Sequence, residues 1–145
     1  MIDVGKNNSS PPFLTFLRYN NYMDIEKILM NFLWFRTQIK LFHWTSKSYA
    51  RHVALDKLEK QTSGIVDDLI EEMMATDVQP NTYEEKEEKF KYWIGDEPGQ
   101  TEKYLELFVE FLEKLKKDVT AGQSNKIDEI MSSIEKALYK LKYLE

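Results

Sequence analysis

The chain contains no cysteine, which excludes disulfide bonds, thiolate metal sites, iron–sulfur clusters and cysteine nucleophiles. Any metal ion would therefore be bound by oxygen and nitrogen ligands alone. A chain without cysteine is also typical of a reducing compartment. Its first residues, Met1 to Asn8, lack the apolar run of a secretory signal peptide. These features predict a cytoplasmic location.

Glycine and proline are scarce, with 5 and 4 residues among 145, so the chain has few of the turns that a sheet would need. Leucine, lysine, glutamate, isoleucine and methionine are abundant instead, which favours long helices. No run of 18 apolar residues occurs, so we expect no membrane association. The composition predicts an all-α protein.

An excess of positive charge is also missing, because 20 lysine and arginine residues face 25 aspartate and glutamate residues, for a formal net charge of −5. Contacts to phosphate groups need clustered cations, and neither terminus supplies a lysine-rich tail. We therefore expect no tight nucleic-acid binding. The length suits one domain, with residues 1–20 as a flexible tail and residues 21–145 as the folded part.

Apolar residues recur at steps of three and four along four segments, which is typical of helices with one buried face. The predicted helices cover residues 21–44, 49–74, 100–120 and 124–144, with a short acidic helix from Tyr83 to Trp93. Ser124 is expected to cap the last helix and Gly122 to end the one before it. On the second helix the expected inward positions are Val53, Leu58, Ile65, Leu69 and Met73. This layout predicts a four-helix bundle with a short extra helix between its second and third helices.

Both histidines, His43 and His52, lie within ten residues of each other. Asp56, Asp67 and Glu71 follow His52 by four, fifteen and nineteen residues. At about 100° per residue, the four side chains on the second helix fall within an arc of roughly 100°. At about 1.5 Å per residue, however, Asp67 lies roughly 16 Å beyond Asp56, so one helix cannot wrap all four around one metal ion.

A second copy of the chain would overcome this separation. Positions 52 and 71 have the same midpoint as positions 56 and 67, so one two-fold axis near Gln61 and Thr62 brings both pairs together. Ser63 and Gly64 lie beside the axis, where small side chains let two helices approach closely. This contact accounts for a mid-helix glycine that costs about 1 kcal/mol. The predicted metal ligands are His43, His52 and Asp56 from one chain and Asp67 and Glu71 from the other. Iron, manganese and zinc all suit such mixed ligands.

Other interpretations of these carboxylates stay open. Charged residues make up 31% of the chain, so aspartate and glutamate on a helix can simply face water. Asp68 and Glu72 form a second pair with the same spacing, which could replace the first if the helix were rotated. The acidic run between Glu84 and Glu88 could attract cations or merely cover an exposed helix.

The motif resembles that of the Dps-like mini-ferritins in the ferritin-like superfamily. In that family a Lys-x-x-His-Trp sequence ends the first helix, and a later histidine is followed at four, fifteen and nineteen residues by Asp, Asp and Glu. The matching residues here are Lys40, His43, Trp44, His52, Asp56, Asp67 and Glu71. The link between the two histidines is shorter than in typical members and lacks their Gly-x-x-Phe element. It resembles a short branch encoded by phages and large DNA viruses.

The resemblance implies a ferritin-like bundle with a ferroxidase site shared across a two-fold dimer interface. Such a site binds Fe²⁺ and oxidises it with peroxide or dioxygen, and Lys40 or Trp44 would lie just outside its ligands. The protein would form a homodimer or a larger homo-oligomer, in the host cytoplasm if the gene is viral. The alternative is a metal-free helical structural or interaction protein that keeps the same fold.

Overall fold

The computed structural model describes residues 25–76, 91–95 and 99–144. These ranges contain four long helices, one short 3₁₀ helix and no strand, which confirms the all-α prediction. The helices are α2 (Ile25–Thr45), α3 (Tyr49–Thr76), α4 (Gln100–Leu115) and α5 (Ala121–Tyr143), and the 3₁₀ helix is η1 (Lys116–Asp118).

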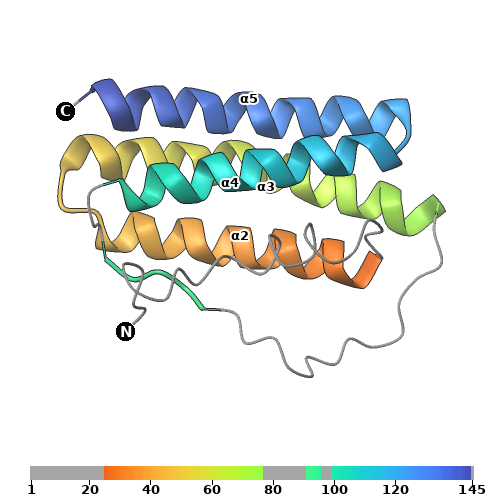
Figure 1. The fold of residues 1–145 in the computed structure, drawn as a ribbon, viewed down its shortest axis with the longest axis horizontal. Coiled ribbons are helices and arrows are strands. Elements are labelled where there is room, and N and C mark those ends of the chain that lie inside the picture. Colours follow the sequence, from red (N-terminus) through yellow and green to blue (C-terminus); the bar gives the residue numbers. More distant parts are fainter. Residues whose placement is uncertain (1–24, 77–90, 96–98, 145) are drawn as a thin grey trace.

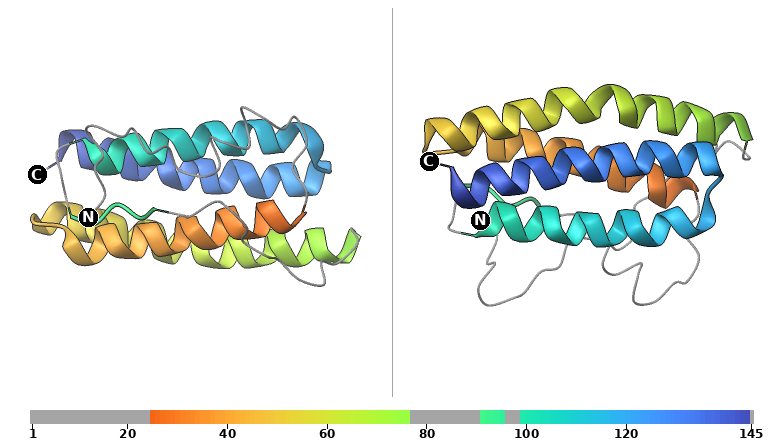
Figure 2. Two further views of the ribbon diagram at one scale, coloured as in Figure 1. Left: turned by 60° about the horizontal axis from the view of Figure 1, so that its bottom comes forward. Right: turned by 90° about the horizontal axis from the view of Figure 1, so that it is seen from above.

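The four helices form two layers (Figures 1 and 2). Helices α2 and α3 lie side by side in one layer, and α4 and α5 lie in the other. Contacts between α3 and α5 join the layers along one side. The short connection at residues 46–48 makes α2 and α3 antiparallel neighbours, so the end of α2 lies beside the start of α3.

Aromatic side chains from α2 and α4 occupy the space between the layers. The rings of Phe35 and Phe108 stack with their centroids 4.1 Å apart, and Phe32 and Tyr104 pack around this pair. All four side chains are at most 1% exposed. Burying a large aromatic side chain stabilises a fold by roughly 1.5–3 kcal/mol, so this cluster is a major source of stability.

A non-helical segment at residues 91–95 packs against α2. Trp93 is buried, its backbone N–H donates to Oε1 of Gln38 at 2.8 Å, and Nε2 of Gln38 donates back to the Trp93 carbonyl at 2.8 Å. The predicted helix from Tyr83 to Trp93 is therefore wrong at its end, and its first eight residues lie outside the described residues. The predicted tail and the predicted helix start at Asn21 also lie outside them.

Two predicted helix ends differ from the structure. Helix α4 ends at Leu115, and Gly122 lies inside α5 instead of ending α4. Thr120, not Ser124, caps α5: its hydroxyl accepts from the Gln123 N–H at 3.2 Å, and the Gln123 side chain accepts from the Thr120 N–H at 3.2 Å. This reciprocal pair satisfies two backbone donors at once, which a serine four residues further along cannot do.

Side chains predicted to be inward are mostly buried, but Val53 is 43% exposed. Five residues separate Val53 from the buried Leu58, so about 140° separates their side chains around the helix axis. Val53 therefore lies on the outer face of α3. Trp44, at the end of α2, is also exposed, whereas Trp34 and Trp93 are buried.

Candidate functional site

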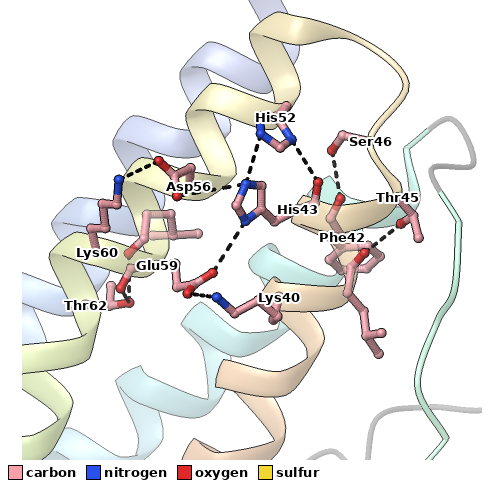
Figure 3. A network of polar contacts seen from close by, with 12 residues as sticks. Lys40, Phe42, His43, Thr45, Ser46, His52, Asp56, Glu59, Lys60 and Thr62 are labelled. Carbon is pink, nitrogen blue, oxygen red and sulfur yellow. Dashed lines mark hydrogen bonds and ion pairs between the residues drawn. The ribbon is translucent and has the colours of Figure 1, made fainter.

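The turn between α2 and α3 brings the two histidines together. The hydroxyls of Thr45 and Ser46 each donate, at 2.7 Å, to a carbonyl one turn earlier and so satisfy acceptors at the end of α2. The Ser48 hydroxyl accepts from the Arg51 N–H at 3.1 Å, as an N-terminal cap of α3 does. His43 in the last turn of α2 and His52 in the first turn of α3 therefore face each other (Figure 3).

A paired guanidinium fixes the first turn of α3 against the other layer. Arg51 donates to both carboxylate oxygens of Glu102 on α4, at 2.9 and 3.2 Å. Burial by itself would raise the pKa of Glu102, but the hydrogen bonds it accepts and the charge of Arg51 outweigh burial and hold that pKa below its usual value. The residue next to His52 is thus held by a two-point ion pair.

The two imidazole rings and one carboxylate form the centre of the site. Nε2 of His43 lies 3.2 Å from Nε2 of His52, and 3.9 Å from Oδ1 of Asp56. The His43 side chain is only 12% exposed, whereas Asp56 is 36% exposed. The structure therefore brings together three of the five predicted ligands: His43, His52 and Asp56.

Glu59 is a fourth member of this cluster that the sequence analysis missed. Its Oε2 atom lies 3.6 Å from Nδ1 of His43, and its other oxygen binds the Lys40 ammonium. Both Nδ1 of His43 and Oε2 of Glu59 are buried without a hydrogen-bond partner. Glu59 follows Asp56 by three residues and His52 by seven, so helical spacing on the same face could have indicated it.

The ring nitrogens restrict where protons can lie. Nδ1 of His52 lies 3.1 Å from the His43 carbonyl, which can only accept, so the contact requires a proton on Nδ1. In the neutral ring, Nε2 of His52 then presents a lone pair. Nε2 of His43 must then either donate a proton to this lone pair or share a cation with it. If a cation binds both Nε2 atoms, Nδ1 of His43 keeps its proton and can donate it to Glu59.

The spacing of the two rings suits a metal ion. Two nitrogens that each lie about 2.1 Å from one metal ion, at roughly a right angle or somewhat more, are about 3.0–3.4 Å apart. The observed separation of the two Nε2 atoms is 3.2 Å. The unpartnered Nδ1 of His43 and Oε2 of Glu59 fit the same arrangement, since a metal-bound histidine usually donates its other N–H to a carboxylate.

Lysine ammonium groups neutralise both carboxylates of this cluster. Lys60 lies 2.9 Å from Oδ2 of Asp56, and Lys40 binds Glu59. The hydrogen bond from Lys60 holds the pKa of the Asp56 carboxyl below its usual value. The Lys60 side chain is 74% exposed, so it can leave Asp56 for water at little cost when another cation binds.

Asp67 and Glu71 lie in the second half of α3, away from the histidines of their own chain. Oδ1 of Asp67 accepts from Arg36 at 3.0 Å, and both carboxylates are exposed. Within the described part of a single chain, no group of three or more histidine, aspartate or glutamate side chains is arranged to hold a metal ion. In the alternative pair, Glu72 binds Lys126 of α5 at 2.8 Å and so turns toward the other layer. The acidic run at residues 84–88 lies outside the described residues.

Across residues 25–76, 91–95 and 99–144, no helix is long and apolar enough to cross a membrane. No curated protein and no solved structure matches the chain. A protein family described as a family of unknown function, DUF5856, matches residues 43–141. This range contains all four residues of the cluster: His43, His52, Asp56 and Glu59. Because this match covers more than half of the sequence, the chain belongs to the DUF5856 family.

Proposed function

We propose that the protein is a Dps-like iron-binding protein of ferritin-like fold, with a ferroxidase-type site shared across a two-fold dimer interface. The observation that carries the proposal is the pair of imidazole Nε2 atoms 3.2 Å apart, with the Asp56 carboxylate beside them. The four long helices and the short turn that joins α2 to α3 support it. Fe²⁺ is the substrate, and the same ligands suit manganese or zinc.

In this proposal each site takes ligands from both chains. His43, His52 and Asp56 come from one copy, and Asp67 and Glu71 come from the second half of α3 in the other. Hard carboxylate ligands favour the ferric product. Two Fe²⁺ ions each lose one electron, and one hydrogen peroxide takes up both electrons and two protons to give two waters; dioxygen is the alternative oxidant. The protein acts as a homodimer or larger homo-oligomer, in the cytoplasm.

A metal-free structural or interaction protein is the second candidate function. One observation favours it: the two carboxylates of the cluster are already neutralised by Lys40 and Lys60. In that case the histidines and carboxylates would only join α2 to α3. The two functions differ in whether the cluster binds and oxidises Fe²⁺.

Aerobic addition of Fe²⁺ distinguishes them. We expect absorbance in the ferric charge-transfer region to rise faster with the protein than in buffer alone. Replacing two ligands together, His52→Ala with Asp56→Ala, should abolish the difference. Glu135→Ala removes an exposed carboxylate of α5 as a matched control and should keep the wild-type rate. Equal rates for the wild type and the double variant would contradict the proposal and support the metal-free function.

Subunit complementation tests whether the site is shared. One variant lacks His52 and Asp56, the other lacks Asp67 and Glu71, and each is expected to be inactive alone. A mixed dimer contains one doubly defective site and one intact site, so random mixing of equal amounts should restore roughly one quarter of the wild-type rate. No recovery after subunit exchange would show that the site lies within one chain.

A further inference from the structure

An apolar groove opens on the α2–α3 layer at the end away from the histidines. Its volume is about 300 Å³, and its apolar lining comes from α2 and α3. The apolar lining residues are Leu29, Phe32, Leu33, Val66 and Ile70. Leu33 is 52% exposed, so part of this apolar lining faces water.

Large exposed apolar side chains lie close in sequence to the two histidines, at the other end of the same layer. Trp44 is 68% exposed, Tyr49 is 83% exposed and Val53 is 43% exposed. The first lies in the last turn of α2 and the other two in the first two turns of α3. The single chain thus has an apolar groove at one end of this layer and apolar projections at the other.

A single two-fold axis would place the apolar projections of one copy over the groove of the other. The axis near Gln61 and Thr62, which brings Asp67 of one copy opposite Asp56 of the other, also brings Val53 opposite Ile70. Arg36 binds Asp67 and Lys40 binds Glu59, so α2 runs antiparallel to α3 along the whole layer. The end of α2 in one copy therefore comes to lie over the groove of the other.

The charges along α3 favour the same pairing. Residues 49–62 carry three lysine or arginine residues and two carboxylates, whereas residues 63–76 carry four carboxylates and no lysine or arginine. An antiparallel second copy places the acidic half of each α3 against the more basic half of the other. A parallel copy would place four carboxylates against four, which is unfavourable.

We infer that the groove between α2 and α3 receives Trp44, Tyr49 and Val53 of a second copy of this chain. The inference rests on the two-fold axis of the proposed function. It adds the apolar contacts that hold the two copies together without metal, because exposed aromatic side chains that enter a groove are typical anchors of an interface. Each copy supplies one groove and one set of anchors, so the dimer closes on itself.

A charge placed in the groove tests this interface. In a buffer that contains a metal chelator, we expect sedimentation or light scattering to give the mass of a dimer for the wild-type protein. Leu33→Arg should raise the dimer Kd about tenfold or more, which corresponds to about 1.4 kcal/mol. Because Leu33 is half exposed, this substitution should leave the helical circular dichroism unchanged. Tyr139→Arg is the matched control, as Tyr139 is 58% exposed on α5 in the other layer, and it should not change the Kd.

Cross-linking tests which residues meet, because the chain has no cysteine of its own. Protein carrying Val53→Cys is mixed with protein carrying Ile70→Cys and treated with a short bis-maleimide. A covalent dimer should form in the mixture. The Val53→Cys protein alone should form little covalent dimer, since the two copies of position 53 lie roughly 25 Å apart along the helix axis.

Three results would overturn the inference. A monomeric wild type, an unchanged Kd for Leu33→Arg, or no cross-link in the mixture each shows that a second copy does not fill the groove. The apolar segment at residues 13–17 is the competing occupant. If deletion of residues 1–20 exposes a thiol introduced by Leu33→Cys to a reagent, while the protein stays monomeric, that segment occupies the groove.

Failure of this inference can be distinguished from failure of the proposed function. All measurements of mass are made without metal, and the double variant His52→Ala with Asp56→Ala should remain a dimer. An intact dimer without Fe²⁺ oxidation contradicts only the proposed function. Fe²⁺ oxidation by a protein whose mass does not respond to Leu33→Arg contradicts only the groove contact.

Discussion

At the scale of single residues, Glu59 is the carboxylate that lies behind His43. One Glu59 oxygen binds Lys40 and the other lies 3.6 Å from Nδ1 of His43. A proton on Nδ1 would face Oε2 and, in the proposed site, leave Nε2 free to bind a metal ion beside His52. In the proposed metal site, Glu59 would be a positioning residue that acts through His43.

Substitution of Glu59 should weaken metal binding without unfolding the protein. We expect Glu59→Ala to lower the affinity for Co²⁺, a spectroscopic substitute for Fe²⁺, by about 10- to 100-fold, which is typical for loss of a carboxylate behind a metal-bound histidine. Glu59→Gln keeps an oxygen acceptor, so its Co²⁺ affinity should fall less than that of Glu59→Ala. Anaerobic titration followed by the visible Co²⁺ bands measures both.

The control for this prediction is Glu135→Gln, which changes an exposed carboxylate of α5. A purely structural role for Glu59 would lower the melting temperature and leave the Co²⁺ affinity of the folded protein unchanged. Wild-type affinity in Glu59→Ala would therefore contradict the positioning role.

Residue spacing predicted part of this cluster. The sequence indicated three of its members. His43 and His52 are the only histidines in the sequence, and Asp56 follows His52 by one helical turn. Helical spacing places Glu59 on the same face, but spacing alone does not select it among many carboxylates, because its contact with His43 depends on how α2 lies against α3. The contribution of Asp67 and Glu71 stays a prediction, since it depends on a second copy.

At the scale of elements, the start of α5 depends on one capping box. Thr120 and Gln123 each accept from the other's backbone N–H. Thr120→Ala should lower the free energy of unfolding by about 1 kcal/mol, the usual value for loss of an N-terminal cap. Urea unfolding followed by circular dichroism measures the change.

Ser124→Ala is the matched control for this cap. Ser124 was predicted as the cap because serine is a common N-terminal cap, yet it lies within α5. Its replacement should change the free energy of unfolding by only a few tenths of a kcal/mol, because alanine is a good helix former. A larger loss for Ser124→Ala than for Thr120→Ala would show that the helix starts at Ser124 in solution.

The helices themselves could be predicted because buried apolar residues recur at steps of three and four over many turns. Leu58, Leu69 and Met73 are buried, as this pattern predicts. Helix ends depend on a few polar hydrogen bonds and were less predictable. Val53 was misplaced because its apolar side chain suggested the core, while its angular position is on the outer face of α3.

At the scale of the whole molecule, the α2–α3 layer combines three features. The histidine cluster lies at one end, the apolar groove lies at the other, and the exposed Gly64 lies near the middle of α3. A methyl group added at Gly64 would meet nothing within 4 Å in the single chain. Packing within one copy therefore does not account for this glycine, whereas the proposed close approach of a second copy would account for it.

Gly64→Ala should therefore act in opposite directions on the monomer and the dimer. Alanine should stabilise the isolated chain by about 0.5–1 kcal/mol, because it favours the helix. In the dimer its methyl group should separate the two copies of α3 and raise the dimer Kd. We expect the variant to melt higher than the wild type at low protein concentration and to lose the rise in melting temperature with concentration that dimerisation produces.

Ser132→Ala, at an exposed position of α5, should raise the melting temperature without changing its dependence on concentration. Scanning calorimetry over a wide range of protein concentrations measures both variants. If Gly64→Ala raised the melting temperature equally at every concentration, the face around Gly64 would not be part of a dimer interface.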